Sequence, residues 1–213
     1  MEPSPTRARP LFALLVLLWL TGCATTPPSS FYVLTPLAQA ERRDVTLAEG
    51  RVTVGIGPVS FPDFLDRPQI VTRAGANRLD LDELNRWGGS LQDGFLRTLG
   101  ENLAHLLGTA QILVYPAEVR FPVDYRVIAT VLRFEGAKGG EAVLKVRWAV
   151  TDPYSERPLA VRESTYRNRV AAPGAEGLVA ALSASLGDFS RDVATTLRQL
   201  PKPQPPRLGL EPI

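Results

Sequence analysis

The feature that most constrains this chain is a short apolar run near its start. Residues 11–20 read LFALLVLLWL, Arg7 and Arg9 precede them, and Cys23, the only cysteine, follows closely. A basic stretch, a short apolar stretch and small residues before a cleavage point are typical of a bacterial export signal. A transmembrane helix needs about 20 apolar residues to cross the hydrocarbon core of a bilayer. This run is too short for that, so we predict a signal peptide over residues 1–22.

The residues around Cys23 predict what happens at that cysteine. Leu20-Thr21-Gly22-Cys23 matches a lipobox, the motif at which signal peptidase II cleaves and leaves a lipidated cysteine as the new N-terminus. The alternative is that Cys23 is a buried small apolar residue. We favour lipid attachment because residues 24–30 (ATTPPSS) form a polar tether that packs poorly. Seven residues in a polyproline II conformation span about 22 Å, so the tether keeps the folded part close to its membrane.

Charge and cysteine content exclude several classes of protein. Residues 1–22 hold two of the 24 basic and one of the 22 acidic side chains, so the mature chain is nearly neutral. A nucleic-acid-binding protein would need a basic stripe, and polybasic attachment to anionic lipid would need a cluster of lysines and arginines. With Cys23 lipidated no thiol is left, so neither disulfides nor cysteine metal sites are expected.

Two amphipathic helices are predicted from apolar residues at helical spacing. The first begins at Ser90, which opens a capping box with Asp93, and ends at Gly108. The second runs from about Ala175 to Leu200, and Pro201 ends it. The residues 201–213 (PKPQPPRLGLEPI) predict a flexible Pro-rich tail.

Alternation and β-branched residues predict the strands. They lie at 31–34, 51–56 (ended by Gly57-Pro58), 69–73, 77–84, 111–115, 125–134, 142–150 and 159–170. The strand at 125–134 is apolar on both faces, with Val127, Ala129 and Val131 on one and Ile128, Leu132 and Phe134 on the other. This pattern favours a central strand covered on both sides. We therefore predict an α/β fold: a mixed β-sheet with an antiparallel meander and two long amphipathic helices packed on opposite faces.

The sequence contains no combination of residues that is typical of a catalytic site. His105, the only histidine, lies on the flank of the first helix's apolar stripe, where a boundary residue is more common than a catalytic one. Asp80, Asp82 and Glu83 form the densest acidic group, but a solvated polar strand face explains them better than acid–base chemistry. We expect no enzyme activity, no metal and no cofactor, and we interpret the chain as a binding or assembly component.

Several segments together resemble a known family. They are FYVLTP (31–36), VGIGPVSFPDFLDRPQIVTR (54–73), NRLDLDELNRWGGSL (77–91), LGENLAHLLG (99–108) and ILVYP (112–116). In this order after a lipobox, they resemble the ABC-type transport auxiliary lipoproteins of the paraquat-inducible protein C type. The resemblance covers roughly residues 23–200, with the domain itself at 31–200, and the LDRPQIV segment is its most specific part.

The resemblance implies a role in envelope lipid transport. Family members are lipoproteins that work with mammalian-cell-entry (MCE) domain proteins, which move phospholipid between the two membranes and so support envelope integrity. The implied fold is similar to the N-terminal domain of TolB, and some members are implied to form rings. Ala24 favours outer-membrane delivery, since aspartate after the cysteine is the usual inner-membrane retention signal. The alternative is an activator of a cell-wall synthase, against which the short tether argues.

One segment within the matching region is a candidate partner-binding site. Asp66, Arg67, Pro68 and Gln69 follow Leu65, and Pro68 restricts the backbone there. Asp66 and Arg67 could pair with a partner or with each other. They could equally close a local turn that only supports the fold, and the sequence leaves these alternatives open.

Overall fold

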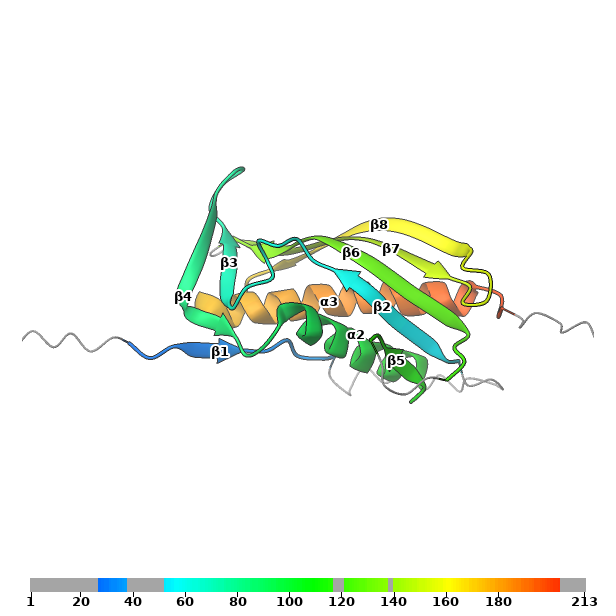
Figure 1. Cartoon of the computed structure of the whole chain (residues 1–213). Helices are drawn as coiled ribbons and strands as arrows, with labels where there is room; N and C mark the ends of the chain where they lie inside the picture. Colours follow the sequence, from blue (N-terminus) through cyan, green and yellow to red (C-terminus); the bar gives the residue numbers. More distant parts are fainter. Residues whose placement is uncertain (1–26, 38–51, 117–120, 138–139, 204–213) are drawn as a thin grey trace, which may run out of the picture.

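The computed structural model describes residues 27–37, 52–116, 121–137 and 140–203. The predicted signal peptide, Cys23 and residues 204–213 of the predicted tail lie outside the described residues. Two helices and eight strands form the described part (Figure 1). The helices are α2 (Leu91–Leu107) and α3 (Gly174–Gln199). The strands are β1 (Ser30–Tyr32), β2 (Val54–Ser60), β3 (Gln69–Arg73), β4 (Leu79–Trp87), β5 (Ile112–Val114), β6 (Tyr125–Gly136), β7 (Glu141–Thr151) and β8 (Pro158–Arg169).

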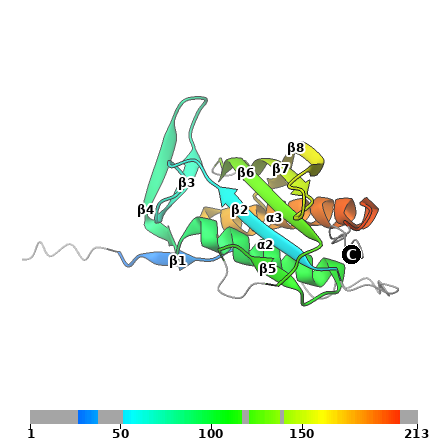
Figure 2. The ribbon, with the colours of Figure 1, turned by 45° about the vertical axis from the view of Figure 1, so that its right-hand side comes forward.

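The sheet is mixed and is organised around β6. This strand pairs antiparallel with β7, which pairs antiparallel with β8, so the predicted meander is confirmed. Its other edge pairs parallel with β2 and, at the end of β6, with β3, where Thr72 is in register with Gly136. β3 and β4 form an antiparallel hairpin that stands out from the rest of the sheet in Figure 2. β8, β5 and β1 each pair with one strand only.

The helices lie together on one face of the sheet, so the prediction of opposite faces is wrong. α2 contacts β2 and β5, α3 contacts β6, β7 and β8, and the two helices contact each other (Figure 1). Phe95 of α2 and Phe189 of α3 have ring centroids 6.3 Å apart. On the other face of β6, Ile128 and Leu132 are half-buried and Thr130 is exposed. These apolar residues on the second face do not require a helix to cover them.

The prediction that Phe134 and Val127 lie on opposite faces of β6 is also wrong, and a bulge in the strand explains why. The register of β6 against β7 shifts between Val131 and Arg133. Because side chains alternate along a strand, one extra residue moves every later side chain to the other face. Phe134 therefore joins Val127 in the core, and its ring centroid lies 5.4 Å from that of Phe95.

The second strand also continues further than predicted. Gly57-Pro58 does not end it, because β2 extends to Ser60 and pairs with β6 on both sides of an irregularity between Ile56 and Val59. The glycine and proline form a bulge within the strand, which is a usual place for both residue types.

The predicted helix ends are confirmed. The hydroxyl of Ser90 accepts a hydrogen bond from the amide of Asp93 at 3.2 Å, which satisfies a free N–H of the first turn of α2. Gly108 ends that helix in the left-handed region, at φ 66°. In the described part of the chain, neither helix is both long and apolar enough to span a membrane.

Candidate functional site

The N-terminal strap, residues 30–37, is built into the fold from both sides. Its first residues form β1, which pairs parallel with β4 and places Phe31 in register with Arg86. The amide of Gly88 donates to the carbonyl of Tyr32 at 2.8 Å, which extends this pairing. Further along, the side chain of Leu34 is buried in the core. The strap is therefore anchored where it enters the domain, directly after the predicted tether.

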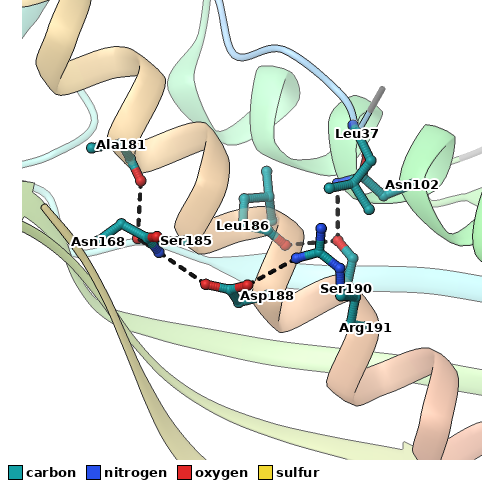
Figure 3. Close-up of polar contacts among 9 residues, drawn as sticks. All are labelled: Leu37, Asn102, Asn168, Ala181, Ser185, Leu186, Asp188, Ser190 and Arg191. Atoms are coloured by element: carbon teal, nitrogen blue, oxygen red, sulfur yellow. Dashed lines mark hydrogen bonds and ion pairs between the residues drawn. The ribbon is translucent and has the colours of Figure 1, made fainter. Parts of the chain in front are cut away.

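Two side chains of the helices hold the backbone of the strap. The hydroxyl of Ser183 in α3 accepts from the amide of Thr35 at 3.2 Å. The Oδ1 of Asn102 in α2 accepts from the amide of Leu37 at 2.8 Å, and the Nδ2 of Asn102 donates to Ser190 at 3.0 Å (Figure 3). A buried amide without a hydrogen-bond partner destabilises the folded state. These contacts therefore allow the backbone of the strap to pack against the two helices.

Gly187 makes room for the strap on α3. A Cβ atom at this position would lie 2.7 Å from Cδ2 of Leu37, closer than real side chains approach. A glycine inside a helix is unfavourable by roughly 1 kcal/mol relative to alanine, so its presence here fits a close approach. Figure 3 shows Leu37 beside Asn102 of α2, near Ser190 and Arg191 of α3.

A second polar group fixes α3 to the sheet. The Nδ2 of Asn168 in β8 donates to Asp188 at 2.9 Å and to Ser185 at 3.1 Å. Asp188 also accepts from Arg191 at 2.8 Å (Figure 3). The helix that holds the strap is thus itself held by the edge strand of the meander.

The strap carries an apolar edge, formed by Phe31 and Val33, and it borders a groove. Phe31 is 67% exposed and Val33 is 58% exposed, although both are large apolar residues. The adjoining groove of about 440 Å³ runs between the strap, the end of β4 and the first turns of α2. It is lined by Tyr32, Val33, Leu34, Trp87, Gly88, Gly89, Ser90, Leu91, Asp93, Gly94 and Arg97.

The predicted partner-binding residues lie in the turn that leads into β3. The amide of Arg67 donates to the carbonyl of Leu65 at 2.9 Å, and the carbonyl of Pro68 accepts from Trp87 at 2.7 Å. Gln69 donates to Glu83 across the hairpin at 3.2 Å. Within the described ranges, no ion pair joins Asp66 to Arg67, and Asp66 is exposed. The turn supports the fold through its backbone while leaving the Asp66 carboxylate accessible.

The other polar residues singled out in the sequence do not form one site. Asp80 pairs with Arg78 at 3.4 Å on the exposed hairpin. The carboxylate of Asp82 accepts from the amides of Leu84 and Asn85 and so stabilises a bulge in β4. His105 lies half-buried in the last turn of α2. Among the described residues, no group of three His, Cys, Asp or Glu side chains is placed to hold a metal ion.

A buried ion cluster that the sequence pattern does not predict lies where β3 enters the hairpin turn, beside the end of β6. Glu135 in β6 is fully buried, and its Oε1 accepts from Arg73 at 2.8 Å and from Arg133 at 2.9 Å. Its Oε2 accepts from the amide of Phe134 at 3.0 Å. The bulge before Glu135 makes its orientation hard to predict from alternation.

A second, more exposed ion cluster lies on the outer face of the meander. Glu163 of β8 accepts from Lys145 and Arg147 of β7, each at 2.9 Å. Hydrogen bonds from Lys145 and then from Arg147 lower the pKa of the Glu163 carboxyl. All three side chains are well exposed, so solvent weakens this cluster.

Comparisons with known proteins agree with this fold. One similar solved structure is a crystal structure of an uncharacterized protein: 20% identity, TM-score 0.65, covering 80% of this chain and 99% of the other. Another is a protein of Xanthomonas campestris, at 16% identity and a TM-score of 0.64, covering 80% of this chain and 98% of that one. No curated protein matched the sequence. The family model of the ABC-type transport auxiliary lipoprotein component matches residues 32–194, and the chain belongs to this family.

Proposed function

We propose that this protein is a non-catalytic, lipid-anchored subunit of an MCE-type lipid transport complex, on the periplasmic face of the outer membrane. The family supports the auxiliary lipoprotein role. Within the structure, the docking of the strap carries the proposal. β1 begins at Ser30, so residues 24–29 alone connect the predicted lipid at Cys23 to the fold. Six residues reach at most about 22 Å, which holds the domain close to its membrane.

The docked strap makes the protein suited to positioning a partner. A long free tether would let the domain sample a wide volume, whereas a short tether that leads into a strap held by two helices limits both distance and orientation. A component that meets a transport complex at a membrane needs this restriction. It gains affinity because a tethered contact is effectively intramolecular.

The first experiment tests the anchor and the partner together. Wild-type protein and a Cys23→Ser variant, each tagged at the C-terminus, are expressed in the native host, crosslinked and purified. The wild type should pellet with the outer membrane and recover an MCE-domain protein. Cys23→Ser should stay folded by circular dichroism but leave the membrane and lose most of that recovery. Clean purification of crosslinked wild type without an MCE-domain protein would refute the transport role.

The Asp66–Gln69 turn is our candidate for the partner contact. The variant Asp66→Lys reverses a charge that is exposed on the turn, while Asp63→Lys reverses another exposed charge three residues earlier. Asp66→Lys should reduce crosslinking to the partner at least several-fold and Asp63→Lys should not. Equal recovery with both variants would remove the turn from the interface.

A further inference from the structure

Four exposed apolar side chains lie on the strap and on β4, the strand with which it pairs. Among the described residues, Phe31 and Val33 lie on the strap and Leu81 and Leu84 on β4, and all four are large, apolar and exposed. Figures 1 and 2 show β1 and β4 side by side at one end of the molecule. Tyr154 and Val161, the other exposed large apolar residues in these ranges, lie elsewhere, in the β7–β8 turn and on β8.

Phe31 and Val33 face away from the fold for a local reason. Residues two apart on an extended strand project to the same side, and the residue between them projects to the other. Tyr32 takes the inward side and donates a hydrogen bond from its hydroxyl to Asn85 at 3.0 Å. Fixing Tyr32 and burying Leu34 therefore leave Phe31 and Val33 projecting outward together.

The length of chain before the strap identifies what can cover these side chains. Phe31 is eight residues after Cys23, the predicted lipid attachment point. Eight residues at about 3.1 Å each, in the polyproline II form expected of this Pro-rich tether, span about 25 Å. A lipidated Cys23 would lie at the bilayer surface, so both side chains stay within reach of the headgroup region.

Tethering also makes such a small contact sufficient. Two apolar side chains could not hold a free protein on a membrane, since even one myristoyl chain binds only marginally. A contact next to an existing anchor is intramolecular and is populated at a far lower intrinsic affinity. Arg86 is in register with Phe31, and its guanidinium pairs with Glu83 at 3.6 Å.

We propose that Phe31 and Val33 insert into the lipid surface next to the lipidated Cys23. This second contact fixes the orientation of the domain on its membrane. The proposal rests on the lipid anchor of the proposed function and adds a membrane-facing surface to it. The occupant of the apolar edge is phospholipid, and coverage by a protein is an outcome that the test separates.

The chain allows a direct measurement because acylation consumes its only thiol. A cysteine introduced by Phe31→Cys or Val33→Cys can be nitroxide-labelled at that position alone. Val161→Cys on β8 is the matched control, because Val161 is 65% exposed and Phe31 67%. The labelled lipoproteins are reconstituted in phosphatidylethanolamine–phosphatidylglycerol vesicles. Collision with oxygen, which enters the bilayer, is then compared with collision with a polar nickel chelate.

Labels at positions 31 and 33 should favour oxygen over the nickel chelate several-fold more than the label at 161 does. Protein that pellets with vesicles but shows equal nickel access at 31, 33 and 161 would overturn the membrane contact and leave the anchor intact. Labels at 31 and 33 shielded from both reagents would assign the edge to a protein surface instead. Lipoprotein that fails to pellet would overturn both the anchor and the contact.

Discussion

At the scale of single residues, Glu135 connects two strands through a buried ion cluster. Its buried carboxylate joins Arg73 of the hairpin to Arg133 of the central strand, so three charges share one site. Removing the charge of a buried carboxylate leaves its partners uncompensated. Both arginines are about one-third exposed or less and can recover some hydration.

The first prediction is therefore that Glu135→Gln lowers the free energy of unfolding by about 2 kcal/mol, less than for a fully buried pair. Glutamine keeps the shape of the side chain, so the effect reports the charge. Urea denaturation at pH 7 measures it, with Glu163→Gln on the exposed outer face as the control. A loss no larger than that of the control would show that the cluster stabilises nothing beyond its packing.

Glu163 gives a prediction about pH. Lys145 and Arg147 lower the pKa of this carboxyl in the folded state. A lowered pKa contributes stability above the unfolded value of about 4.3, and that contribution is lost as the pH falls through the folded pKa. Wild type should therefore exceed Glu163→Gln in stability at pH 6, and the difference should disappear in the acid range. Denaturation at several pH values tests this, and a constant difference would contradict the lowered pKa.

At the scale of elements, the strap is the part whose stability can be probed locally. Ser183 accepts from the amide of Thr35, and alanine cannot. A hydrogen bond contributes about 0.5–1.5 kcal/mol, so Ser183→Ala should speed exchange of the Thr35 amide by about three- to ten-fold. Ser185→Ala, two residues along α3, removes a contact to Asn168 instead and should leave the Thr35 amide unchanged. Equal effects would mean that the serine does not hold the strap.

The elements themselves were largely predictable, and their arrangement was not. Local signals such as Ser90 and Gly108 mark helix ends because they act within a few residues. Phe134 was placed on the wrong face because a bulge reverses alternation, and a bulge depends on pairing with a distant strand. The hydrogen bond between Asn102 and the amide of Leu37 could not be predicted for the same reason. An asparagine in the middle of a helix does not indicate that it binds a residue 65 positions earlier.

The candidate sites also differ in whether the sequence could reveal them. The lipobox and the LDRPQIV segment are continuous in sequence, so both could be singled out, and their proposed roles stay predictions. The Glu135 cluster joins strands more than 60 residues apart and follows a bulge. The apolar edge was hidden because residues 31–34 look like any short strand. Only the docking of Leu34 and the pairing of Tyr32 show which of their neighbours remain exposed.

At the scale of the whole molecule, the short tether leads directly into the docked strap. In the proposed function, the tether limits the distance from the membrane, and the strap transmits that limit to the helices and the sheet. Both helices lie on the strap's side of the sheet, while the outer face of the meander carries exposed charged and apolar side chains. Under the proposed anchoring, the tether directs the face that carries the strap, and the outer face of the meander is left exposed.

The last prediction separates attachment from position. About 20 Gly/Ser residues inserted between Pro28 and Ser29 would give a tether whose typical span is about 28 Å and widely variable. Cys23 is unchanged, so the variant should still pellet with membranes, but the effective concentration of the domain at its partner falls. The variant should restore the detergent resistance of a deletion strain less than half as well as wild type. Replacing residues 25–29 with five Gly/Ser residues keeps Ala24 and the length of the tether and should restore it fully. Full restoration by the long tether would show that anchoring alone, without a fixed distance, is enough.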